Sequence, residues 1–98
     1  MNIQKFIWKE QFEDKLEVKH GVFPDEVEDA IKGRFHRVKF RKLKRGKVRG
    51  EDLYLALDRT EAGRYLFIVF IYKLHQRAAL IISARDMDES ERKQYGRK

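Results

Sequence analysis

The sequence predicts a single α+β domain with a mostly antiparallel sheet, two helices near the N-terminus and a short C-terminal helix. Its 98 residues suffice for one small core, and an aromatic content of 12% argues against disorder. Apolar residues recur with helical spacing before Gly33 and with strand-like alternation after it. Strands that follow helices favour an α+β fold with helices on one sheet face. The expected order is strand, helix, helix, four strands, helix.

The first elements are a strand and a helix. Residues 3–8 form a short apolar and aromatic run that is typical of a strand. A helix is expected over residues 9–20, where Phe12 and Leu16 are four residues apart and share one helical face. Gly21 should end this helix, because glycine readily follows a helix C-terminus.

A second helix is expected between Pro24 and Gly33. Proline suits the first helical position, and the acidic Asp25 and Glu26 favour the positive end of the helix dipole. A buried stripe is predicted at Val27, Ala30 and Ile31.

Strand signals continue beyond the helices. Val38 and Phe40 should face one side of a strand, opposite Arg37, Lys39 and Arg41. The next strand alternates in the same way, with its leucines on one face: Leu53, Leu55 and Leu57.

The last three elements are two strands and a helix. Residues 65–72 are apolar throughout, which predicts a central strand covered on both faces. Residues 73–76 read as a hairpin turn before a strand over 77–84, whose even positions should face the core. A charged helix is expected over 86–95.

The net charge of +7 is concentrated in one segment. Between residues 34 and 50 the chain has nine cations and no acidic residue: Arg34, Arg37, Lys39, Arg41, Lys42, Lys44, Arg45, Lys47 and Arg49. Such a block favours a polyanion, with nucleic acid first because phosphate neutralisation releases counterions. The alternatives are an acidic protein partner, an anionic membrane surface, or a solvated hairpin that binds nothing.

Other classes of chemistry are excluded or unsupported. The chain has no cysteine, so disulfides, thiolate chemistry and Cys-ligated zinc are excluded. His20, His36 and His75 do not have the spacing of a metal site, and no phosphate loop or nucleophile elbow is present. The longest apolar run has eight residues and the N-terminus does not resemble a secretory signal. We therefore expect a cytoplasmic protein without membrane, metal or cofactor requirements.

Ser83 and Arg85 form one candidate phosphate site. They lie two residues apart on a predicted strand, so their side chains should be roughly 7 Å apart on one face. An arginine fork and a hydroxyl can both donate to phosphate oxygens. The alternative is that Arg85 forms an ion pair that fastens the last helix, with Asp86, Asp88 or Glu91.

Lys19 and His20 form a second candidate site at the end of the first helix. The partial negative charge of a helix C-terminus favours a cation there. A protonated His20 could act as a general acid, and Lys19 could stabilise phosphorane charge. A simple capping or surface histidine is the alternative.

Three strings resemble the BrnT family of toxins. They are Phe-Ile-Trp at 6–8, Lys-His-Gly-Val at 19–22, and Ile-Ile-Ser-Ala-Arg at 81–85 followed by Glu-Arg-Lys-Gln-Tyr at 91–95. Their order and spacing agree with the family over nearly the whole chain. The resemblance implies a RelE-like fold and a ribonuclease toxin of a type II toxin–antitoxin pair.

The resemblance also implies partners and a mechanism. The antitoxin would carry a ribbon-helix-helix DNA-binding part, and the complex would bind operator DNA. Cleavage would be metal-independent attack of a ribose 2′-OH on the adjacent phosphate, with Lys19, His20 and Arg85 supplying the proton transfer and positive charge. The expected RNA-binding residues are Arg37, Lys39, Arg41, Lys42, Arg77 and Ser83.

One departure from the family affects the predicted activity. Family members tend to carry Glu-Arg entering the third strand, where this chain has Asp52-Leu53. Arg59 and Arg77 are candidates to replace the missing arginine. The alternative function is a catalytically inactive module that binds nucleic acid or an antitoxin through its basic surface.

Overall fold

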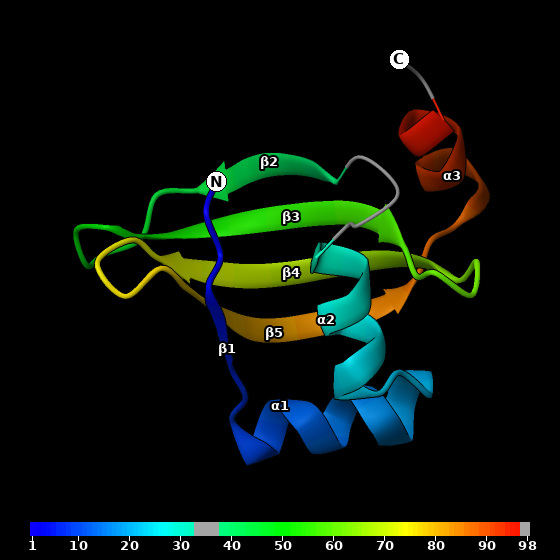
Figure 1. Ribbon diagram of the computed structural model, residues 1–98, viewed down its shortest axis with the longest axis horizontal. Helices are drawn as coiled ribbons and strands as arrows, with labels where there is room; N and C mark the ends of the chain where they lie inside the picture. Colours follow the sequence, from blue (N-terminus) through cyan, green and yellow to red (C-terminus); the bar gives the residue numbers. More distant parts are fainter. Residues whose placement is uncertain (33–37, 97–98) are drawn as a thin grey trace.

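The computed structural model describes residues 1–32 and 38–96 and contains a five-stranded sheet with strand order β1-β5-β4-β3-β2 (Figure 1). The strands are β1 (Lys5–Ile7), β2 (Lys39–Lys44), β3 (Glu51–Arg59), β4 (Tyr65–Lys73) and β5 (Ala78–Asp86). The helices are α1 (Glu10–Lys15), α2 (Pro24–Lys32) and α3 (Glu89–Gly96), and a π-helical turn η1 (Leu16–His20) directly continues α1. The predicted α+β class is confirmed; the predicted first helix divides into α1 and η1.

The sheet is mixed but mostly antiparallel. Within the described residues β1 pairs in parallel with β5, whereas the other pairings are antiparallel. Across the same residues, no helix is long and apolar enough to span a membrane.

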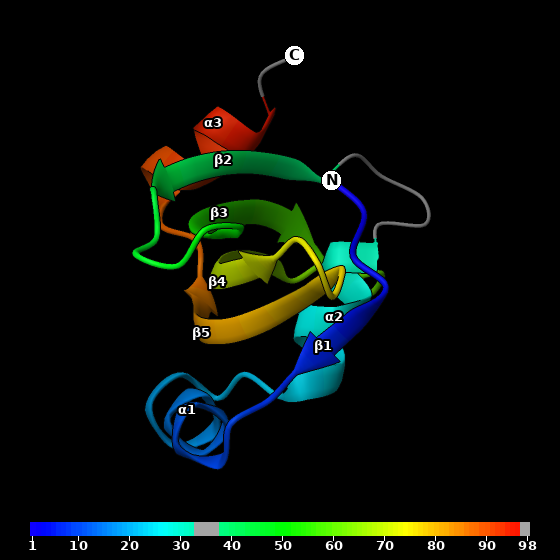
Figure 2. The same ribbon diagram turned by 90° about the vertical axis from the view of Figure 1, so that its left-hand side faces the viewer.

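Helices α1 and α2, together with η1, cover one face of the sheet, which we call the helix face. The main core lies there, and α2 contributes the predicted stripe of Val27, Ala30 and Ile31. The expectation that all helices pack on one face is wrong for α3, whose Tyr95 packs against a smaller cluster containing Leu57. Figure 2 shows α1 and α3 on opposite sides of the sheet.

The central strand β4 is covered unequally on its two faces. Its even positions, such as Ile68 and Phe70, are fully buried, whereas odd positions such as Phe67 and Val69 are partly exposed. The predicted coverage of both faces is therefore wrong. The reason is that the long helical layer lies on one side only, and α3 covers just one end of the other side.

A β-bulge changes the facing of β5. Phe70 pairs with Ile81 but Val69 pairs with Ser83, so Ile82 is an extra residue between successive partners. The side-chain alternation therefore shifts by one residue, and Ala84 joins Ile81 in the main core. Of the even positions of β5 that were predicted to face the core, Ala84 does so. Ala78 and Leu80 are also buried, but before the bulge the main core contains the odd positions Ala79 and Ile81 instead.

The turns mark two ends of the sheet. The β2–β3 and β4–β5 turns lie side by side at what we call the hairpin end (Figure 1), where Leu74 N donates to Gly50 O at 2.9 Å. A Cβ on Gly46 would lie 1.7 Å from Glu51 O, so this turn requires glycine. The β3–β4 turn and the end of β5 lie at the opposite end, which we call the far end, roughly 27 Å away along a nine-residue strand.

Arg64 fastens the far end. Its Nε and Nη2 donate to the two oxygens of Asp86 at 2.7 and 3.1 Å, and its Nη1 donates to Glu26 at 3.0 Å. The same guanidinium donates to the carbonyls of Gly21 (2.9 Å) and His20 (3.3 Å). One arginine thus links β4, the end of β5, the start of α2 and the end of η1. These hydrogen bonds, with Asp86 first, raise the pKa of Arg64 and keep it charged.

Replacing Arg64 with methionine should lower the free energy of unfolding by about 2 kcal/mol, because Asp86 and Glu26 lose their partner in a partly buried site. Urea denaturation measures the change. Lys93→Met is the control: Lys93 is 71% exposed and should change stability by less than about 0.5 kcal/mol. Equal effects of the two substitutions would contradict the role assigned to Arg64.

Candidate nucleic-acid interface

The sheet face opposite the helix face carries cations along both sides of an apolar strip. Strand register places four residues in one row across it, Lys39, Leu57, Phe67 and Arg85, and four in the next, Arg41, Leu55, Val69 and Ser83. We call these two rows the open face. The sequence-predicted residues Lys39, Arg41, Ser83 and Arg85 therefore share one surface.

The dimensions of the open face suit an extended polyanion. Neighbouring strands lie about 4.8 Å apart, so a row of four residues spans roughly 14 Å, and successive rows are roughly 7 Å apart. Arg41 is exposed and has no ion pair among residues 1–32 and 38–96. Val69 and Phe67 are partly exposed between the flanking polar residues. Phosphates can contact the flanks while bases contact the apolar strip.

Arg85 is held by α3. Its Nη1 and Nη2 each donate to one oxygen of Glu91 at 2.8 Å, and Nη1 also donates to the carbonyl of Asp86 at 3.0 Å. The guanidinium lies over the Phe67 ring, 4.0 Å from its centroid. The predicted alternative, an ion pair with the last helix, is thus present with Glu91. A phosphate at Arg85 has to displace Glu91.

Glu91 also helps to cap the N-terminus of α3. Its backbone N–H donates to Asp88 Oδ1 at 2.8 Å, and its side chain accepts from Asp88 N at 2.9 Å, which is a reciprocal capping box. The hydrogen bond from Arg85, more than any other contact, lowers the pKa of the Glu91 carboxyl. One carboxylate therefore both caps α3 and fixes the open-face arginine.

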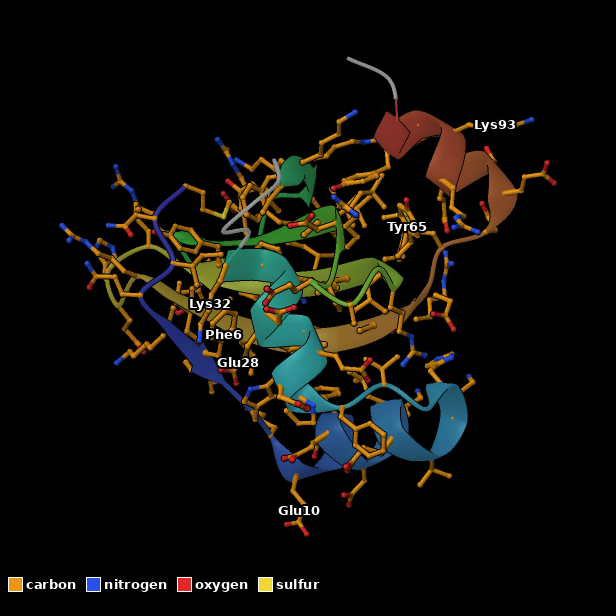
Figure 3. The ribbon with its side chains drawn as sticks, turned by 45° about the vertical axis from the view of Figure 1, so that its right-hand side comes forward. Phe6, Glu10, Glu28, Lys32, Tyr65 and Lys93 are labelled. Carbon is orange, nitrogen blue, oxygen red and sulfur yellow. The ribbon has the colours of Figure 1, made fainter. Side chains whose placement is uncertain are left out.

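Lys39 belongs to the same junction. Its Nζ donates to Gln94 O at 3.0 Å and lies 5.8 Å from the centre of the Tyr95 ring. Tyr95 in turn donates to Asp58 Oδ1 at 3.0 Å, and burial, with this bond, raises the pKa of Tyr95 to about 12. Lys39 and Arg85 are therefore both anchored to α3, so the row containing Arg41 and Ser83 is the more accessible one. Figure 3 shows Tyr65 beneath α3 and Lys93 pointing away from the protein.

Lys19 and His20 lie on the helix face of the sheet, across β5 from Arg85. They end η1, and Gly21 stops the helix with φ of 62°, as predicted. His20 is partly buried, whereas Lys19 is exposed. Through Arg64, the His20 carbonyl connects to Asp86, whose side chain alternates with that of Arg85 along β5. The structure brings Lys19 and His20 together at the helix face but places Arg85 on the open face.

The hairpin end carries the remaining basic residues. Lys42 Nζ pairs with Asp52 Oδ2 at 2.9 Å, and Gly46 N donates to Asp52 Oδ1 at 2.9 Å. Lys42, more than any other group, lowers the pKa of Asp52. Lys47 and Arg49 have no ion pair within the described part of the chain. Together with Lys42 they line a hollow of about 950 Å³ that is open to solvent.

Arg77 and Arg37 were also predicted to bind RNA. Arg77 is exposed in the β4–β5 turn at the hairpin end, with φ of 51°. Arg37 lies outside the described residues. Arg59 and Arg77 were the candidates to replace the arginine that the BrnT resemblance implies at position 53. Arg59 ends β3 at the far end and Arg77 lies at the hairpin end, so neither adjoins Leu53 in the register.

The sequence did not predict that Arg64 links the far end of the sheet to the helices. The turn Thr60-Glu61-Ala62-Gly63-Arg64 predicts a hairpin, but it does not predict which carboxylates the arginine contacts. Those partners lie 22 and 38 residues away along the chain.

Comparisons with known proteins leave the family open. No protein-family model matches this sequence, and a search of curated proteins gives no significant match. The resemblance to BrnT toxins therefore rests on the three strings themselves. Within the described ranges, the structure groups no three His, Asp or Glu side chains as a metal site.

Glu91→Gln should lower stability at pH 7 and remove part of its pH dependence. The pKa of Glu91 is lowered in the folded protein from its ordinary value of 4.5, so its contribution is complete above about pH 4.5 and is lost as pH falls through the lower folded pKa. The difference in unfolding free energy between wild type and variant should thus shrink below about pH 4.5, as measured by urea denaturation. Glu89→Gln, on a side chain that is 89% exposed, is the control. If the difference in unfolding free energy between wild type and Glu91→Gln stays constant from pH 7 to pH 3, ionisation of Glu91 does not contribute to the pH dependence of stability.

Proposed function

We propose that this protein is a cytoplasmic endoribonuclease toxin that binds single-stranded RNA on its open face. The observation that carries the proposal is the placement of Lys39 and Arg41 along one side of that face and Ser83 and Arg85 along the other. Lys47 and Arg49 line a separate hollow at the hairpin end and supply long-range attraction for a polyanion. The resemblance to BrnT toxins supplies the class of enzyme and an antitoxin partner with a ribbon-helix-helix part, which would carry the complex to operator DNA.

The proposed cleavage uses the ribose 2′-OH as nucleophile. The 2′-OH gives its proton to solvent as the 2′-oxygen attacks the adjacent phosphorus, and the bond from phosphorus to the 5′-oxygen breaks. Protonated His20 donates a proton to the 5′-oxygen as it leaves, and a 2′,3′-cyclic phosphate remains on the first fragment. Arg85 would stabilise the additional negative charge once RNA phosphate replaces Glu91. Lys19 and His20 are the proposed proton-transfer and charge-stabilising groups. Because they lie across β5 from Arg85, the RNA strand has to pass over the free edge of β5 beyond its short pairing with β1.

A second candidate function is RNA binding without cleavage. The ion pair between Arg85 and Glu91 favours binding without cleavage, because the Arg85 guanidinium is already neutralised by a carboxylate. The division of Lys19 and His20 from Arg85 favours it as well. The BrnT resemblance implies Glu-Arg where this chain has Asp52-Leu53, and the lack of that arginine also favours binding without cleavage.

Arg41→Ala should weaken binding of single-stranded RNA several-fold and uniformly across sequences. Loss of one phosphate contact should also reduce the slope of log K against log salt by about 0.7. Fluorescence anisotropy over a salt series measures both quantities. Lys93→Ala removes an equal charge from the exposed side of α3 and should leave the slope nearly unchanged. If Lys93→Ala and Arg41→Ala have the same effect, binding is not located on the open face.

Expression of the protein alone should arrest bacterial growth, and the purified protein should cut RNA in the presence of EDTA. His20→Ala and Arg85→Ala should each relieve toxicity, with thermal unfolding confirming that both variants fold. Glu91→Gln removes the carboxylate that pairs with the Arg85 guanidinium, and this variant should retain cleavage. Salt-dependent RNA binding by wild type without any strand scission selects the second function, and full toxicity in both alanine variants moves the active site elsewhere.

A further inference from the structure

A second hollow lies at the hairpin end, on the opposite side of the sheet from the open face. It has a volume of about 580 Å³ and lies where the N-terminal residues meet the β2–β3 and β4–β5 turns. Tyr54, Tyr72, Asp52 and Arg77 line it, together with residues 1–2, Gly50 and Leu74. Tyr72 belongs to the core cluster of the helix face and Tyr54 packs against it, so this hollow is separate from the open face.

The wall of this hollow is aromatic and rigid. The Tyr54 ring stacks on Phe70 with centroids 5.9 Å apart and an interplanar angle of 20°, and it meets Tyr72 edge-on at 6.3 Å. Tyr72 is fixed further, because its hydroxyl donates to Asn2 O at 2.6 Å. Tyr54 is only half-buried, and its hydroxyl has no hydrogen-bond partner in the described part of the chain. A flat ligand therefore meets a surface that needs no rearrangement.

Arg77 stands at the rim in an unusual backbone conformation. Its φ of 51° lies in the left-handed region, which glycine adopts without strain and arginine does not. The backbone is held there because Arg77 O accepts from Gln4 N at 2.8 Å. The turn therefore places a long cationic side chain at a backbone position that favours glycine. Arg77 has no ion pair within residues 1–32 and 38–96.

The rim also continues into the basic hairpin. The hollow shares Gly50, Asp52 and Leu74 with the neighbouring one that Arg45, Lys47 and Arg49 line. Asp52 is occupied on both oxygens by Lys42 and Gly46 N, so it does not neutralise Arg77. A ligand that extends from the aromatic wall toward the β2–β3 turn meets Arg45, Lys47 and Arg49 beyond Asp52.

We propose that this hollow binds one unpaired nucleotide, with the base against Tyr54 and the phosphate on Arg77. A flat apolar body joined to an anionic group matches an aromatic wall with a cationic rim, and base stacking on aromatic side chains is tolerant of sequence. An inorganic anion alone does not use the aromatic wall. The assignment of this nucleotide to an RNA strand rests on the proposed function, whereas binding of a mononucleotide does not.

The test is binding of adenosine 5′-monophosphate to the whole protein by isothermal titration calorimetry at low salt. The mononucleotide should bind with one-to-one stoichiometry and about tenfold more tightly than either adenosine or inorganic phosphate. Arg77→Gly suits the native φ and should reduce the affinity for the mononucleotide to that for adenosine, without changing adenosine binding. Tyr54→Leu should weaken adenosine and the mononucleotide about tenfold and leave phosphate binding unchanged.

Two controls decide the outcome. Lys93→Ala removes one charge at the far end and should leave mononucleotide binding unchanged, and thermal unfolding must show that Tyr54→Leu is folded. Equal affinities for phosphate and mononucleotide, or equal losses in Arg77→Gly and Lys93→Ala, would overturn the proposal. If the hollow fails this test while the wild type cuts RNA and Arg41→Ala weakens RNA binding, the proposed function stands. If the mononucleotide binds but RNA does not, the hollow stands and the proposed function fails.

Discussion

The open face depends on one extra residue in β5. Ala79 and Ile81 point into the main core, so a regular strand would also send residues 83 and 85 inward, beneath α1 and η1. The bulge at Ile82 reverses the alternation, and Ala84 fills the core position in their place. A polar serine and a charged arginine thereby reach the opposite face without the cost of burying an unpaired charge. The cationic flank on the β5 side exists because of this irregularity.

The sequence predicted the elements well because their signals are local. Gly21, Pro24 and the alternation of Val38, Lys39 and Phe40 each constrain the chain within a few residues, and the structure agrees with them. The facing of β5 could not be predicted in the same way, because small or apolar residues occupy both parities from 78 to 82. Ser83 and Arg85 were correctly placed on one face, since that relation needs only their spacing. What covers that face is a tertiary property, and here it is the short helix α3.

Long-range ion pairs separate the cations that can meet a ligand from those that hold the fold. Arg64 and Arg85 are bound to carboxylates in fork-to-fork geometry, which fixes them strongly. Lys42 and Lys73 pair with acids that start β3. The block of nine basic residues overstated the available charge, because Lys42 is already paired and Lys39 is anchored to α3. The block also leaves out Arg85, which lies on the open face with Lys39 and Arg41.

Under the proposed function, the pairing of Arg85 with Glu91 would link RNA binding to the position of α3. An RNA phosphate and the Glu91 carboxylate present the same kind of acceptor to one guanidinium, so only one can occupy the fork at a time. Exchange therefore costs the helix its attachment to β5, although Asp88 still caps it and Tyr95 still bonds to Asp58. Lys39, at the other end of the first row, bonds separately to the end of α3 through Gln94 O. In the proposed RNA complex, Arg41 and Ser83 need no such release, so the strand would meet them first and α3 would govern access to Arg85.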